Sequence, residues 1–171
     1  FESNEADAAG GLAVLAEGFK PAAPVTILNC AISGNSVKGS GAGLFLRSNG
    51  SRAVTVANTT VAGNDAGSNG GGILYQSQES MGAEPARLIN SIVWGNTALA
   101  DPAIVISAFN LMKPVPLEVD VSAIEGGCAP GPALTCGMVL TDPPSFVDLA
   151  GGDVHLAPGS KLIDAGDDAL A

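Results

Sequence analysis

The sequence predicts an all-β fold, a right-handed single-stranded parallel β-helix of about four coils with three strands per coil and an irregular C-terminal cap. A motif of the form N-x-x-[IV]-x-G-N starts at Asn29, Asn58 and Asn90, so successive copies begin 29 and 32 residues apart. Short β-rich runs flank each copy of the motif. Nowhere does a 3.6-residue apolar period extend far enough for a substantial helix, which excludes helical solenoids.

Each coil is predicted to contain three short strands separated by turns. They are residues 41–46 and 70–75 for the first strand, residues 25–28, 54–57 and 86–89 for the second, and the motif itself for the third. Phe1, Asn4 and residues 10–14 repeat the same frame at the N-terminus. In such a solenoid each strand pairs with its equivalent about 4.8 Å away in the next coil.

Alternate residues of these strands are predicted to point inward and to stack in columns. The predicted inward set is Val25, Val54, Ile27, Val56, Leu88, Ile32, Val61 and Val93. Asn29, Asn58 and Asn90 are predicted to form a structural ladder at the bend between the second and third strands. Asn tolerates left-handed backbone angles, and its amide can hydrogen-bond the next Asn in the stack. Val121 occupies this position in the fourth coil, so the ladder is expected to end there.

The chain is predicted to be one domain, with β-helix coils over residues 1–126 and the cap over residues 127–171. Cys128 and Cys136 bracket a short loop, so a disulfide between them is expected in an exported protein, with two free thiols as the alternative. The thiol of Cys30 is expected to point inward beside Thr59 and Ser91.

Two parts of the chain carry a family resemblance. Phe1-Glu-Ser-Asn4 through Gly10-Gly11 is similar to an F-x-x-N-x-A-x-x-G-G repeat, and Asn90-Ser-Ile-Val-Trp-Gly-Asn96 to a late coil; residues 122–127, 142–148 and 152–166 are similar to a terminal cap. These segments resemble bacterial β-helix proteins with polymorphic outer-membrane-protein-like repeats and a C-terminal module called choice-of-anchor Q. The resemblance implies secretion and display at the cell surface, without one particular activity.

Charge and hydropathy exclude several partners. The chain has 17 acidic and 7 basic residues and a formal net charge of −10, which disfavours nucleic acid and anionic lipid. Its apolar runs are far shorter than the ~20 residues that cross a bilayer, so no membrane-spanning segment is predicted. The first residue is Phe1, so any secretion signal is expected to have been removed or to lie outside this sequence.

The sequence predicts no catalytic residues and no obligatory cofactor. Sugar-active β-helices need clustered carboxylates on one sheet, whereas the first-strand segments are apolar. Asp142, Asp148, Asp153, Asp164 and Asp167 are weak candidates for a Ca²⁺ site, because calcium takes oxygen ligands. Hydrogen bonds within Asx turns are the favoured explanation for these residues.

Trp94, Phe45 and Leu74 are the candidate binding residues. Alternation places Trp94 outward, together with the equivalent Ser33 and Ala62, and an exposed Trp can contact a sugar or a protein. The family resemblance favours instead a covered Trp with a structural role. Ala13, Phe45 and Leu74 should form an apolar stripe on the outer face of the first strands, which soluble proteins rarely leave uncovered. That face, or the open N-terminal coil, is expected to associate with the parent protein or a partner.

These features favour a non-catalytic extracellular module at a bacterial cell surface, with a structural, adhesive or binding role toward a carbohydrate or a protein. The alternative is a fragment of a polysaccharide-processing lyase or glycoside hydrolase. Its active site would lie in coils outside this sequence or in a cleft that the sequence does not reveal; cleavage that is lost on changing Asp65 or Asp101 would favour this alternative.

Overall fold

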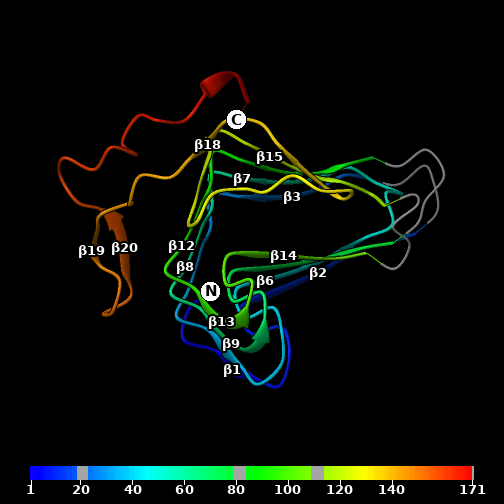
Figure 1. The fold of residues 1–171 in the computed structure, drawn as a ribbon, viewed down its shortest axis with the longest axis horizontal. Coiled ribbons are helices and arrows are strands. Elements are labelled where there is room, and N and C mark those ends of the chain that lie inside the picture. Colours follow the sequence, from blue (N-terminus) through cyan, green and yellow to red (C-terminus); the bar gives the residue numbers. More distant parts are fainter. Residues whose placement is uncertain (19–22, 79–83, 109–113, 171) are drawn as a thin grey trace.

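The computed structural model describes residues 1–18, 23–78, 84–108 and 114–170. These residues wind into a parallel β-solenoid of about three turns (Figure 1). A full turn passes through four parallel sheets, numbered I to IV here, and an antiparallel hairpin lies outside them. Within the described ranges, no helix has the length and apolar character needed to cross a membrane.

The sheets stack equivalent strands of successive turns. Sheet I contains β2 (Leu12–Ala16), β6 (Leu44–Ser48), β10 (Ile73–Ser77) and β14 (Ile104–Ala108). Sheet II contains β3 (Val25–Leu28), β7 (Val54–Ala57), β11 (Ala86–Ile89), β15 (Leu117–Asp120) and β17 (Leu134–Cys136). Sheet III contains β4 (Ala31–Ser33), β8 (Thr60–Ala62), β12 (Ile92–Trp94), β16 (Ser122–Ile124) and β18 (Val139–Leu140). Sheet IV contains β1 (Glu5–Ala6), β5 (Ser36–Val37), β9 (Asp65–Asn69) and β13 (Thr97–Ala100). The hairpin is β19 (Phe146–Asp148) and β20 (Asp153–Leu156), and a 3-10 helix, η1, spans Asp168–Leu170.

Sheet IV corrects the prediction of three strands per coil. Its strands follow the motif directly and are rich in small and polar residues, as in β9 with the sequence Asp-Ala-Gly-Ser-Asn. That composition disfavours strands, so the sequence alone indicates a turn. Pairing with the turns above and below makes these residues extended. Sheets I and IV contain four strands each, whereas sheets II and III contain a fifth strand, β17 and β18, from an incomplete last passage; the solenoid has about three turns.

The predicted inward residues form the core. Sheets I and II face each other, and sheet III joins them at one end (Figure 1). Strand pairing in these three sheets has no register shift, so equivalent side chains stack. Seven of the eight predicted residues are buried, and Val25, in the outermost turn, is half-buried. Tyr75 is fully buried in the same core; its hydroxyl donates to the carbonyl of Val115 at 3.1 Å, and burial raises the pKa of the phenol.

The asparagine ladder is formed by other residues than the predicted ones. Asn29, Asn58 and Asn90 do adopt left-handed backbone angles, with φ of 54°, 49° and 49°. However, the prediction of an amide ladder along this column was wrong. Residues at this outer corner point away from the core, and the Asn29 and Asn58 side chains are exposed.

The hydrogen-bonded ladder consists of Asn4, Asn35, Asn64 and Asn96, the last three being the final residues of the repeated motif. Each Nδ2 donates to the Oδ1 of the next Asn, at 2.8, 2.8 and 2.9 Å. The same Oδ1 atoms accept the preceding backbone N–H at 3.0 to 3.1 Å. Nδ2 of Asn35, Asn64 and Asn96 also donates to a backbone carbonyl of the preceding turn. The central amides are therefore fully hydrogen-bonded without water.

A second polar column runs along the inner corner between sheets II and III. The backbone N–H of Cys30 donates to Thr59 Oγ1, that of Thr59 to Ser91 Oγ, and that of Ser91 to Ser122 Oγ, at 3.4, 3.2 and 3.1 Å. Thr59, Ser91 and Ser122 are buried. Each hydroxyl therefore joins two turns, as the asparagine amides do.

A column of glycines leaves room for the asparagine ladder. A Cβ added at Gly43 would lie 2.6 Å from the carbonyl oxygen of Gly72, 2.6 Å from a methyl of Val61 and 2.9 Å from Nδ2 of Asn64. Gly11 and Gly72 meet equivalent groups one turn away. Backbone, core and ladder meet at this column, so a side chain has no space there.

We predict that Asn64→Ala destabilises the fold far more than Asn58→Ala. Loss of Asn64 leaves buried partners on both sides unpaired, at about 3 to 5 kcal/mol, because each unmet buried group costs roughly 1 to 3 kcal/mol. Asn58→Ala should cost about 1 to 2 kcal/mol, the strain of a left-handed alanine. Urea denaturation followed by circular dichroism measures both values, and equal midpoints would contradict the assigned ladder.

We also predict that Gly43→Ala prevents folding or lowers the melting temperature sharply. The matched control is Gly131→Ala, because a Cβ at Gly131 meets nothing within 4 Å. The control should stay within about 0.5 kcal/mol of the unmodified protein. If Gly43→Ala unfolds at the control's temperature, the close approach of the turns at Gly43 is wrong.

Candidate functional site

The outer face of sheet I contains the predicted apolar stripe, in register. Ala13, Phe45, Leu74 and Val105 are neighbours across β2, β6, β10 and β14. Ala13 is exposed, Phe45 and Val105 are half-buried, and Leu74 is only 8% exposed. The turn before sheet I lies against Leu74, since a Cβ at Gly41 would be 3.2 Å from the Cβ of Leu74. Leu74 therefore offers little surface to a ligand, in contrast to its prediction as a binding residue.

A polar row lies beside the stripe on the same face. Leu15, Arg47, Gln76 and Ser107 share one register position, and Leu15 is 60% exposed. The Arg47 guanidinium lies 5.6 Å from the centre of the Phe45 ring, and its Nε donates to Gln76 Oε1 at 2.9 Å. Glu17 lies 3.9 Å from the same Nε. We call Ala13, Leu15, Phe45, Arg47, Gln76 and Val105 the sheet I face; it combines a planar apolar surface with oriented donors and acceptors.

Trp94 lies at the end of β12 and is half-buried. The outward exposure predicted for its column was wrong, because the equivalent Ser33 and Ala62 are 4% and 0% exposed. The hairpin β19–β20 lies on this side of the solenoid (Figure 1). The side chain of Leu149, in its loop, packs against Gly63 and Gly95, where an added Cβ would lie 3.2 and 2.6 Å from it. The hairpin loop therefore lies over the glycines that follow this column, next to the position where Trp94 was expected to bind a ligand.

The acidic residues of the cap are dispersed into separate local contacts. Asp142 pairs with Lys161 at 2.6 Å, Asp148 accepts the N–H of Gly151 at 3.0 Å, and Asp167 accepts the N–H of Ala169 at 2.9 Å. The N–H of His155, and then its imidazole, lower the pKa of the Asp153 carboxyl. Asp164 adopts a φ of 57°. Over the described ranges, no three His, Cys, Asp or Glu residues form a group that could bind a metal ion.

The carboxylates weighed for catalysis are also separate. Asp65 accepts a hydrogen bond from the hydroxyl of Thr97 in the next turn. Asp101 is exposed at a φ of 49°. The surroundings of neither carboxylate resemble the acid and base pair that glycoside cleavage requires.

The cysteines have two different environments. Cys128 and Cys136 form a disulfide, with their Cα atoms 6.1 Å apart. Both cysteines lie at the C-terminal end of the solenoid, and Cys128 packs against the core. Cys30 is a free thiol of intermediate burial, and its S–H donates to the carbonyl of Leu28 at 3.3 Å. It occupies the place of a hydroxyl in the Thr59–Ser91–Ser122 column.

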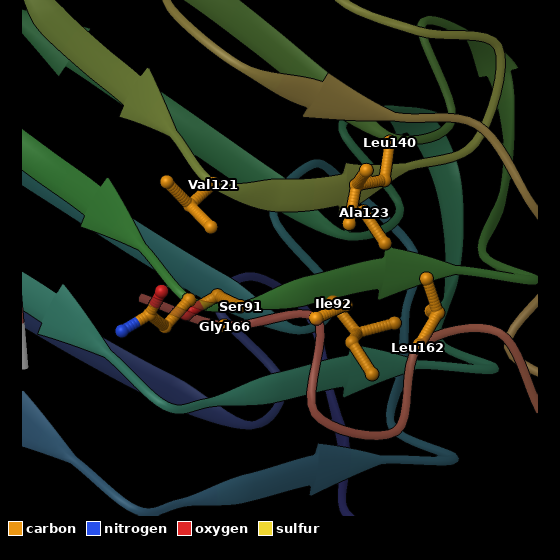
Figure 2. Close-up of a pocket in the computed structure, with 9 residues that line it drawn as sticks. Ser91, Ile92, Val121, Ala123, Leu140, Leu162 and Gly166 are labelled. Carbon is orange, nitrogen blue, oxygen red and sulfur yellow. The ribbon is translucent and has the colours of Figure 1, made fainter. Parts of the chain in front are cut away.

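The outer face of sheet III contains a site that the sequence did not predict. Residues 161–170, which we call the strap, pass over this face, and Leu162, Ala165 and Gly166 line one side of a small open cavity of about 70 Å³ (Figure 2). Leu162 of the strap lies beside Ile92 of β12, with Ala123 and Leu140 on neighbouring strands. Asn90 donates from Nδ2 to the carbonyl of Asp167 and accepts its N–H at Oδ1, both at 2.9 Å. These partners are 77 residues apart, and no repeat or motif links them.

Comparison of the chain with protein-family models, with curated proteins and with solved structures found no match.

We predict that reduction or removal of the disulfide lowers stability. Replacing Cys128 and Cys136 by Ala should cost about 2 to 3 kcal/mol, the loop-closure value for so short a loop. Cys30→Ser should change stability little, because serine matches the hydroxyl column. The measurement is the urea midpoint with and without dithiothreitol; a midpoint that does not move on reduction would contradict the expected contribution.

Proposed function

We propose that the chain is a non-catalytic extracellular module of a bacterial cell surface, and that it works as a rigid adhesive scaffold with the sheet I face as its contact surface. The observation that carries the proposal is the arrangement of this face. Sheets I to III place equivalent residues in straight columns, so the Phe45 stripe and the Arg47 row form one continuous flat surface. Exposed and half-buried apolar residues next to oriented polar groups are typical of recognition surfaces.

The disulfide supports the extracellular location, because such bonds persist in oxidising compartments. The motifs that resemble polymorphic outer-membrane-protein repeats and the choice-of-anchor Q module support surface display. We therefore extend the proposal to export and anchoring of that type. The net charge of −10 disfavours acidic polysaccharides, so we propose a neutral polysaccharide as the ligand.

The test is binding of the immobilised chain to a panel of neutral and acidic polysaccharides. Phe45→Ala should weaken binding to a neutral polysaccharide about 10-fold or more, as loss of a central aromatic contact does. Leu28→Ala is the matched control, since Leu28 is 47% exposed on the outer face of sheet II. Binding unchanged by Phe45→Ala would contradict the assigned face, and absence of binding across the panel would contradict the adhesive role.

The same panel tests the enzymatic alternative. We expect no release of shorter saccharides, with or without Ca²⁺. Cleavage that disappears in Asp65→Asn or Asp101→Asn would replace the scaffold proposal by that of a polysaccharide-processing enzyme.

A further inference from the structure

The contact between the strap and Asn90 recognises a peptide backbone. The Asn90 amide uses its donor and its acceptor on the two backbone groups of a single residue, Asp167. Such a pair of hydrogen bonds does not depend on the side chain of the residue that is bound. Around Asn90, the residues Ser91, Ile92, Val121, Ala123 and Leu140 form what we call the Asn90 flank. This flank therefore combines an amide that binds a peptide backbone with an apolar surface beside it, which we call the seat.

The seat accepts one large side chain. Leu162 of the strap is the large apolar residue that lines the cavity together with Ile92 (Figure 2). Ala165 and Gly166, which follow it, are small and approach Val121. The recognised segment is therefore a leucine, two residues that do not line the cavity, the small pair Ala165 and Gly166, and Asp167, which pairs with Asn90.

Few residues of the strap are buried against the solenoid. In the described part of the chain the strap contributes no strand to sheets I to IV, and most of its residues are exposed. The cavity beneath it is not filled by the strap's own side chains. Gly159, at a φ of 89°, precedes the strap and allows the chain to change direction. Segments with few buried contacts open at low free energy.

We propose that the Asn90 flank is a peptide-binding site and that its second ligand is the strap of another copy of this chain, exchanged for the strap bound in cis. A second copy is the occupant that the structure supports, because its strap has the sequence already seen on this surface. Exchange of an identical segment creates a dimer without any new contact chemistry. This site is separate from the sheet I face of the proposed function.

The first test uses the full chain with Leu162→Asp, which releases the strap and leaves the flank unchanged. The probe is a fluorescein-labelled peptide of residues 161–170, and the readout is fluorescence anisotropy. The variant should bind the peptide, and the unmodified chain should bind it at least ~10-fold more weakly, because its own strap competes at high effective concentration.

Asn90→Ala in the Leu162→Asp background should abolish peptide binding. Asn58→Ala is the matched control, since Asn58 has the same left-handed angle one turn away and no strap contact. Failure of the Leu162→Asp chain to bind the peptide, or equal loss with both Asn variants, would overturn the peptide-binding site.

The second test detects exchange between copies. Ile92→Cys and Leu162→Cys are made separately in a Cys30→Ser background and mixed under mild oxidation. A disulfide-linked dimer is expected. The double variant in one chain should form the bond internally; if it does so while the mixture stays monomeric, the strap remains in cis and the exchange is wrong. If the double variant forms no bond, the strap does not lie on Ile92 and the proposal also fails.

Discussion

Hydrogen bonds between buried asparagine amides fix how the turns of this solenoid stack. The apolar columns tolerate exchange among Val, Ile and Leu; they oppose a shift of one residue, which turns them toward solvent, but distinguish poorly between registers two residues apart. The amides do distinguish, because any such shift would leave buried donors and acceptors unpaired at roughly 1 to 3 kcal/mol each. The ladder also requires glycine at positions 11, 43 and 72. A Cβ there would enter the space of Asn35, Asn64 and Asn96. The ladder therefore restricts which residues can occupy the positions around it.

The two asparagines of each motif serve different purposes. The second follows a glycine at positive φ, as Asn64 follows Gly63, and turns inward to bridge the turns. The first occupies the outer corner, where its own left-handed angle bends the chain and its amide stays outside the core. An outward amide repeated along a corner can bond whatever segment passes over it. At Asn90 that segment is the strap, so a residue needed for the fold also provides a binding group.

The repeat spacing was sufficient to predict the stacking, the core columns and the parallel sheets, because identical positions in a solenoid must coincide. It could not decide which asparagine points inward, since a left-handed residue interrupts the simple alternation of strand side chains. Sheet IV was missed because β9 owes its extended form to its neighbours and not to its own residues. The burial of Leu74 depends on the turn at Gly41. The Asn90 site depends on contact between residues 77 positions apart, for which the sequence contains no periodic signal.

Val121 shows how the end of the repeat is joined to the cap. It occupies the outer corner at a φ of 44°, a conformation that costs a β-branched residue about 1 to 2 kcal/mol or more. It is nevertheless 8% exposed, in a pocket that it lines together with Met138 and residues 165–168 of the strap. Burial of a valine side chain contributes about 1.5 to 3 kcal/mol, which offsets the strain only while the strap is in place. An asparagine would suit the backbone there but would bury its amide under the strap. Valine therefore ends the column of exposed asparagines at this corner. It gives the C-terminal segment of the chain an apolar side chain to pack on.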